Sequence, residues 1–146
     1  MDADAYADSS FLVSLFRADS CHHEASAFMK ENELSLAYTP LHRIEVRNAL
    51  RNAVSCGDLK NAERNLAFRQ IEEDLKDGLL IHMPVNWTDV FRCADELSEK
   101  HSAKEGQRTI DLLHIAIAIE NEAKTFLTFD KRQRGLAKSV GLKVQP

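Results

Sequence analysis

The sequence contains few residues that break a chain or cross-link it. Its 146 residues include five glycines, three prolines and three cysteines, while 44% are hydrophobic. Disordered and low-complexity proteins are excluded as classes, because they have few apolar residues and many glycines, prolines or charges. A domain of this length buries roughly two thirds of the surface that its unfolded chain exposes. We therefore expect one globular domain that spans residues 1–146.

Long apolar runs and a leader pattern are also missing. No run approaches the roughly 20 apolar residues that a membrane-spanning helix needs. The N-terminus carries Asp2 and Asp4 and no basic segment followed by an apolar one, which argues against a secretory signal. Cys21, Cys56 and Cys93 form no Cys-x-x-Cys pair, so we expect buried, reduced thiols and no zinc site. These absences predict a cytoplasmic protein without a membrane segment.

An excess of basic charge is absent too. Lysine and arginine number 19 against 23 aspartates and glutamates, which gives a net charge of −4 at pH 7. Nucleic-acid-binding proteins usually present a basic surface. Any contact with nucleic acid must therefore rely on local patches, and the sequence offers two, which are Arg43, Arg47 and Arg51 at helical spacing and the run Lys131, Arg132, Arg134 and Lys138.

Short apolar segments alternate with helix-forming segments along the chain. We predict strands at 5–7, 34–38, 79–83, 125–129 and 142–145, and helices at 9–16, 20–32, 41–55, 58–76, from 86 or 88 to the polar loop at 104–107, 109–122 and 131–140. Strands that alternate with helices are joined by parallel crossovers, which leave helices on both faces of the sheet. The pattern therefore predicts an α/β fold with a central parallel sheet.

Aspartates end the first and the fourth predicted strands. Residues 5–7 lead to Asp8, and residues 125–129 lead to Asp130. In open α/β sheets, ligands bind in the crevice beyond the carboxyl ends of the strands. A doubly wound order in which these two strands are neighbours would place both carboxylates in that crevice. Taken alone, an acid in the position of Asp130 is most often simply the N-cap of the following helix.

Two further acids stand among apolar residues. Asp111 lies in the first turn of the segment 109–122, which is apolar on nearly all sides. An unpaired charge there would cost several kcal/mol or be neutralised by a shifted pKa, so we expect Asp111 to cap the helix, to bind a cation, or to do both. Glu45 lies on the predicted helix at 41–55. A salt bridge to an arginine of that helix is the simpler explanation for Glu45 taken alone.

Together, the four carboxylates are more informative than they are singly. Each pair of like charges about 4 Å apart costs on the order of 4 kcal/mol at an effective dielectric constant of 20, so a shared crevice requires a cation. An all-oxygen site suits Mg²⁺ or Mn²⁺ better than zinc. Such ions activate water and orient a phosphodiester. Metal-dependent phosphodiester hydrolysis is therefore the predicted reaction, with Asp8, Glu45, Asp111 and Asp130 as catalytic residues and metal ligands.

The segments around these acids resemble the four acidic motifs of PIN domains, in the same order and at the same spacing. The four segments are AYADSSFLVSLFRAD (5–19), TPLHRIEVRNAL (39–50), RTIDLLHIAIA (108–118) and TFLTFDKRQRGLAKSVGLKV (125–144). Together they extend over essentially the whole chain. Within the family, the sequence resembles bacterial VapC-type toxins in particular.

The resemblance implies a three-layer α/β/α sandwich with a central parallel sheet of four to five strands. It also implies Mg²⁺- or Mn²⁺-dependent cleavage of single-stranded RNA, a homodimer, and a small antitoxin that holds the enzyme inactive. Ser9 and Thr128 fall on the family's small hydroxyl positions, and with Lys131 and Arg132 they are the expected substrate-binding residues. Many relatives carry a further acid where this sequence has Lys131, Arg132 and Gln133, which leaves a second metal site without its ligand.

Other functions remain open at this stage. The four acids could serve as caps and salt bridges in a non-catalytic PIN-like interaction module, or the same chemistry could act on structured DNA or on phosphate esters. His114 is explained more simply as a core histidine than as a general base, and Phe91 more simply as core than as a stacking group for bases. Apolar faces on the predicted helices at 20–32 and 58–76 are candidate dimer surfaces.

Overall fold

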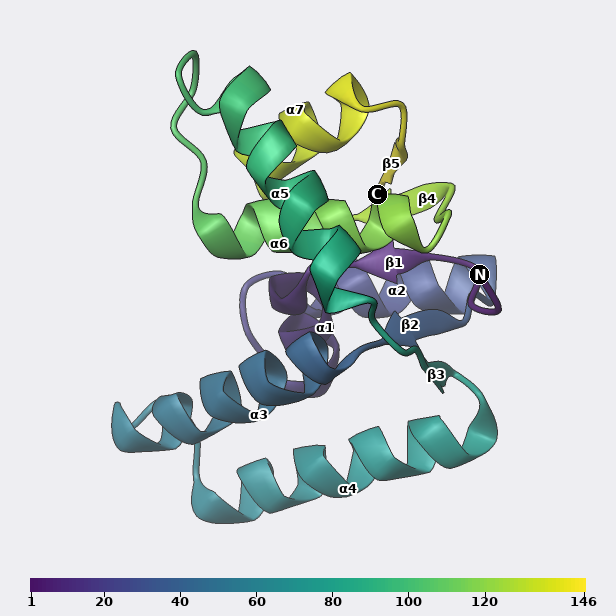
Figure 1. Ribbon diagram of the computed structural model, residues 1–146. Coiled ribbons are helices and arrows are strands. Elements are labelled where there is room, and N and C mark those ends of the chain that lie inside the picture. The colour runs from purple at the N-terminus through teal and green to yellow at the C-terminus, as the bar shows by residue number, and fades with distance from the viewer.

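Five parallel strands alternate with seven helices in this computed structural model, which describes residues 1–146 (Figure 1). The strands are β1 (Tyr6–Ala7), β2 (Leu36–Tyr38), β3 (Leu80–His82), β4 (Thr125–Leu127) and β5 (Lys143–Gln145). The helices are α1 (Ser9–Phe16), α2 (His22–Asn32), α3 (Pro40–Ser55), α4 (Asn61–Asp77), α5 (Trp87–His101), α6 (Thr109–Glu120) and α7 (Lys131–Ser139). No helix combines the length and the apolar character needed to cross a membrane.

The central strand of the sheet is β1. On one side it pairs with β4, with Tyr6 opposite Phe126, and β4 in turn pairs with β5. On the other side an isolated parallel bridge joins Ala5 to Leu36, next to the ladder between β2 and β3. The two ladders therefore continue one another in the order β3-β2-β1-β4-β5. The predicted parallel sheet is confirmed, and so is the predicted contact between the first and fourth strands.

Helices cover both faces of this sheet and form two apolar cores. On one face, α5, α6 and α7 pack their apolar side chains over Tyr6 and Phe126. On the other face, α1 to α4 pack over Ala5 and Ala7. Successive residues of a strand point to opposite faces, which is why Tyr6 belongs to one core and both of its neighbours to the other. The result is the predicted three-layer sandwich.

Most observed helix ends lie within a few residues of the predicted ones, because capping residues and glycines mark them in the sequence. The Thr39 hydroxyl accepts the N–H of His42 at the start of α3, and Gly78 ends α4 in the left-handed conformation with φ of 80°. α4 begins three residues later than predicted, because Lys60 is its N-cap and the Glu63 carboxylate accepts the Lys60 N–H at 3.0 Å. Arg108, and not Thr109, is the N-cap of α6.

Two predictions about burial are wrong. Phe91 is 57% exposed, because its neighbour Val90 points into the core and successive helical residues point about 100° apart. Its ring packs against Trp87 with the two ring centroids 5.9 Å apart. The cysteines are free thiols as predicted, yet Cys56 is exposed at the end of α3 and Cys21 and Cys93 are only half-buried.

A buried histidine joins α3 to the end of β1. The His42 side chain is fully buried, and its Nε2 lies 2.7 Å from the carbonyl oxygen of Ala7. Its Nδ1 accepts the backbone N–H of Thr39 at 3.0 Å. One ring nitrogen must therefore donate and the other accept, which is the pattern of a neutral imidazole. Burial, together with the nearby imidazole of His114, lowers the pKa of His42 to about 3.

This lowered pKa predicts that acid destabilises the fold through His42. The unfolded chain binds this proton near the ordinary pKa of about 6.5, whereas folded His42 binds it only near 3, so the unfolded state holds more protons between these values. The free energy of unfolding should fall as the pH drops through that window, by up to about 1.4 kcal/mol per pH unit. Urea denaturation at several pH values should show a shallower slope for His42→Asn. The exposed His82→Asn control should keep the wild-type slope, and equal slopes for all three proteins would contradict the prediction.

Candidate active site

A cleft of about 440 Å³ opens at the carboxyl ends of β1 and β4. All four acids that the sequence singled out line it, although they come from separate parts of the chain. Asp8 follows β1, Glu45 lies on α3, Asp111 on α6, and Asp130 at the start of α7. The structure therefore brings the four predicted residues together, and it adds Asp19, Arg108 and His114 to the lining.

Asp8 is the most deeply buried of the four acids, with 6% of its surface exposed. One carboxylate oxygen accepts the N–H of Phe11 at 2.8 Å and the hydroxyl of Ser10 at 2.9 Å, so Asp8 is the N-cap of α1. The other oxygen accepts the hydroxyl of Thr128. Burial raises the pKa of Asp8, although the donors from Thr128, Phe11 and Ser10 oppose this shift. Asp8 is thus held in place by partners on both sides.

Glu45 is held by a buried chain of polar groups. Its Oε1 accepts the hydroxyl of Ser9 at 2.7 Å and lies 2.5 Å from Nε2 of His114. The other ring nitrogen of His114 lies 2.7 Å from the Tyr6 hydroxyl. Burial raises the pKa of Tyr6 well above its ordinary value, so the phenol stays protonated. Its hydroxyl therefore donates a hydrogen bond to Nδ1 of His114. Nε2–H of His114 then donates to Glu45.

These contacts decide the charge of Glu45. Burial alone would raise its pKa, but the contacts with His114 and Ser9 and the charge of Arg108 outweigh burial and lower it. The predicted salt bridge to an arginine of the same helix is wrong, because Arg43 and Arg47 reach across to Glu72 of α4 at 3.5 and 3.9 Å. Oε2 of Glu45 accepts no hydrogen bond and remains free at the cleft.

Asp111 and Asp130 have different partners. Both oxygens of Asp111 accept from the guanidinium of Arg108, at 2.8 Å from Nε and 3.2 Å from Nη2. Asp111 therefore pairs with an arginine and does not cap α6, whose N-cap is Arg108. Asp130 is the N-cap of α7, as the sequence suggested, because one oxygen accepts the N–H of Gln133 at 2.9 Å. Its second oxygen accepts no hydrogen bond.

The expected substrate-binding residues occupy two kinds of position. The hydroxyls of Ser9 and Thr128 donate to Glu45 and Asp8, and Thr128 is completely buried. Lys131 and Arg132 are exposed in the first turn of α7 and form no ion pair. The hydrogen bonds from Ser9 and Thr128 to the acids are observed. A contact with substrate remains a prediction for all four residues.

The other basic residues are largely used within the protein. The guanidiniums of Arg47 and Arg51 lie over the ring of Phe68, 4.7 and 5.3 Å from its centroid. Arg134 donates to the carbonyl oxygens of Thr128 and Pro146, at 3.0 and 2.8 Å. The arginine row of α3 is therefore chiefly a contact between α3 and α4, which leaves the start of α7 as the freer basic surface.

Sequence reasoning missed three residues that the structure places at the site. Arg108 could have been found, because it stands three residues before Asp111, a spacing that brings side chains together at a helix start. Tyr6 could not, because its partner His114 is 108 residues away. Asp19 lines the cleft and accepts the hydroxyl of Ser14 at 2.9 Å, which fixes the turn between α1 and α2.

The donor set fits a hard divalent cation in its chemistry. All four acids offer oxygen ligands, and free carboxylate oxygens remain on Glu45 and Asp130. No group of three or more histidine, cysteine, aspartate or glutamate side chains is close enough to hold an ion as the side chains stand. Asp111 in particular is committed to Arg108. A cation held by Asp111 would therefore require this side chain to change partners.

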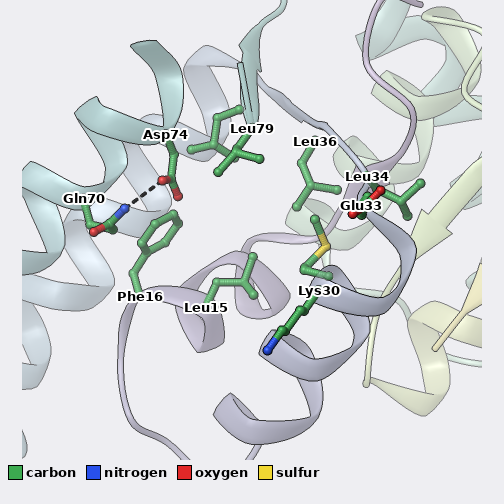
Figure 2. A pocket seen from close by; sticks show the side chains of 11 residues that line it. Leu15, Phe16, Lys30, Glu33, Leu34, Leu36, Gln70, Asp74 and Leu79 are labelled. Atoms are coloured by element: carbon green, nitrogen blue, oxygen red, sulfur yellow. Dashed lines mark hydrogen bonds between the residues drawn. The ribbon is translucent and has the colours of Figure 1, made fainter. Parts of the chain in front are cut away.

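A second cleft, of about 660 Å³, has a different character (Figure 2). It lies between α1, α2 and α4, and apolar side chains form most of its wall, namely Leu15, Phe16, Met29, Leu34, Leu36, Leu79 and Leu80. Its polar residues are at the rim, where Gln70 donates to Asp74 at 2.8 Å. We call this surface the apolar groove. It contains none of the four predicted acids and is suited to binding a protein segment.

Comparisons with known proteins agree with this geometry. The PIN domain family matches residues 5–139. Among solved structures, the chain is similar to a Mycobacterium tuberculosis VapC20, described as a toxin that cleaves the sarcin–ricin loop, with 17% identity, TM-score 0.68, and coverage of 97% of this chain and 99% of that one. It is also similar to chains in VapBC2 from Rickettsia felis bound to a promoter DNA fragment (14% identity, TM-score 0.64) and in FitAcB from Neisseria gonorrhoeae (14%, 0.61), each with 97% of this chain and 96% of the other covered.

A search of curated proteins finds no match. The family match nevertheless spans nearly the whole chain and includes every acid of the cleft. The structural neighbours share its fold over their full length. The expectation drawn from four short acidic segments is thus confirmed, and the chain belongs to the PIN domain family.

Proposed function

We propose that this protein is a divalent-metal-dependent endoribonuclease that cleaves single-stranded RNA and acts as the toxin of a toxin–antitoxin pair. The observation that carries the proposal is the meeting of four acids from four separate elements in one cleft. A purely structural set of caps and salt bridges would not require them to share a cleft. The similarity to VapC20, described as a toxin that cleaves the sarcin–ricin loop, supports the same reaction class.

Each residue of the cleft has a distinct part in this proposal. Asp8, Glu45, Asp111 and Asp130 would hold Mg²⁺ or Mn²⁺, through the oxygen ligands that these ions prefer. When bound, the ion supplies positive charge that lowers the pKa of water and neutralises the phosphate. Lys131 and Arg132 lie directly after Asp130 and are exposed, so they would hold the phosphates next to the cleaved bond.

The first prediction concerns cleavage. Purified protein should cut a pool of single-stranded RNA with Mg²⁺ or Mn²⁺ and not with EDTA. Glu45→Gln and Asp111→Asn should each lower kcat/KM at least about 100-fold, because even outer-shell partners of metal ligands typically account for 10–100-fold. Asp89→Asn is the matched control, since Asp89 forms an ion pair with Arg92 on α5, outside the cleft.

The alternatives give different results in the same assay. Cleavage of structured DNA or of phosphate esters in preference to single-stranded RNA would replace the proposed substrate. A folded wild-type protein that neither binds Mn²⁺ in calorimetry nor cuts any substrate would instead indicate a PIN-like interaction module.

The second prediction concerns the hydroxyl that supports Asp8. Thr128→Val keeps the shape of the side chain but leaves a buried carboxylate oxygen without its donor, which should lower the free energy of unfolding by about 1–3 kcal/mol. It should also weaken Mn²⁺ binding, because the Thr128 hydroxyl helps Asp8 to remain ionised. Thr125→Val in β4 is the control, since the Thr125 side chain makes no hydrogen bond. Equal losses in both variants would show that the hydroxyl has no special part.

The proposed antitoxin partner is supported by the similarity to VapBC2 and FitAcB. The apolar groove is where we expect it to bind, because Leu79 is 52% exposed there and the charged residues that line it are two acids, Glu33 and Asp74, and one lysine, Lys30. Burial raises the pKa of Asp74, and a cation from a partner would reverse this shift. The groove therefore fits an amphipathic helix that carries lysine or arginine beside its apolar face. A homodimer and a cytoplasmic location remain predictions.

A panel of short amphipathic helical peptides with lysine or arginine tests the groove directly. Fluorescence polarisation should detect binding to the wild-type protein, and Leu79→Glu should weaken it about tenfold or more by placing a charge in the apolar contact. Ile44→Glu is the matched control, because Ile44 is 59% exposed on α3 and lies outside the groove. Equal loss in both variants, or binding that ignores the basic residues, would contradict the prediction.

A further inference from the structure

Arg108 forms an unusual contact within the acidic cleft. It is the last residue before α6, and its guanidinium holds both oxygens of Asp111. The Asp111 side chain is only 15% exposed, whereas that of Arg108 is 67% exposed. The acid therefore belongs to the cleft wall, while the cation lies at the cleft mouth with room to move.

The charges around the cleft are strongly unbalanced. Five carboxylates line it, from Asp8, Asp19, Glu45, Asp111 and Asp130, and Arg108 is the only lysine or arginine among the lining residues. The hydrogen bonds and charge of Asp111 raise the pKa of Arg108, and Asp130 and Asp8 add to this effect. Arg108 in turn helps to lower the pKa of Glu45. The charge of the guanidinium thus acts on Asp8, Glu45 and Asp130 as well as on Asp111.

A divalent cation would compete with this counter-ion. An ion that binds Asp111 comes within a few ångströms of the guanidinium, where two positive charges repel each other strongly. The ion pair is open to solvent on the Arg108 side, which is 67% exposed, so water can replace the hydrogen bonds of the guanidinium when it leaves. The long side chain can therefore leave Asp111 without disturbing the helix.

We propose that Arg108 works in two positions, as the counter-ion of Asp111 in the free protein and as a ligand for the substrate phosphate once a divalent ion has taken Asp111. This inference rests on the proposed nuclease function. The planar guanidinium fork fits a phosphate as well as a carboxylate, so the displaced side chain finds an equivalent partner on the RNA. Metal and RNA then favour each other's binding. The metal displaces Arg108 from Asp111, and the RNA phosphate stabilises the displaced side chain.

The first test measures metal affinity in the absence of RNA. Isothermal calorimetry with Mn²⁺ should show binding about tenfold tighter for Arg108→Gln than for the wild type, within the usual range of coupling between two sites. Arg108→Lys should gain less, because it keeps the charge but loses the fork. Arg92→Gln is the matched control, since Arg92 pairs with Asp89 three residues away, is 64% exposed and lies outside the cleft. Circular dichroism verifies that each variant is folded.

The second test measures cleavage of single-stranded RNA, with KM taken at saturating Mn²⁺ and the half-maximal Mn²⁺ concentration taken from a metal titration. Arg108→Gln should raise KM by about tenfold, because a charge-assisted bidentate contact with the phosphate is lost, while the Mn²⁺ concentration that gives half-maximal rate falls. A purely structural role of Arg108 would not move these two quantities in opposite directions. Unchanged or weaker Mn²⁺ binding by Arg108→Gln overturns the counter-ion position, and an unchanged KM overturns the phosphate position. Failure of the wild type to bind Mn²⁺ at all would overturn the proposed function and this inference with it.

Discussion

The parallel pairing of β1 with β4 is the contact on which the site depends. It joins residues 120 positions apart, so that the N–H of Asp8 donates to the carbonyl oxygen of Leu127 and the Thr128 hydroxyl donates to the Asp8 carboxylate. Two helices, α1 and α7, then start from neighbouring strand ends, each with an aspartate as its N-cap. Because the strand pairing places both helix starts side by side, the two carboxylates line the same cleft.

Each acid in the cleft is balanced by a different kind of partner. Asp8 has uncharged donors and is buried, so its pKa is raised, whereas Glu45 meets an imidazole and a guanidinium, and its pKa is lowered. Asp111 forms an ion pair with Arg108, which is the only lysine or arginine that lines the cleft. The like charges of the cleft are therefore offset by three different means, namely burial with neutral donors, an imidazole contact and an arginine pair.

Much of this arrangement could be predicted from the sequence, and the remainder could not for identifiable reasons. Strand-ending aspartates and alternating elements were sufficient for the fold and for Asp8 and Asp130. The acid on α3 was harder, because its partner His114 comes from a helix far along the chain and nothing local announces the contact. Exposure was misjudged at Phe91 and Cys56 since residue type alone does not say which side of a helix faces a neighbour.

The His42 contact ties the scaffold to the chemistry of the site. Its Nε2 lies 2.7 Å from the carbonyl oxygen of Ala7, the residue immediately before Asp8, so the backbone that carries this acid is supported by an imidazole that must stay neutral. Acid that protonates the buried ring would therefore break the contact that holds the strand end beneath Asp8. Acid thus acts on this strand end in two ways, through the carboxyl of Asp8, whose pKa burial raises, and through the ring that supports the residue before it.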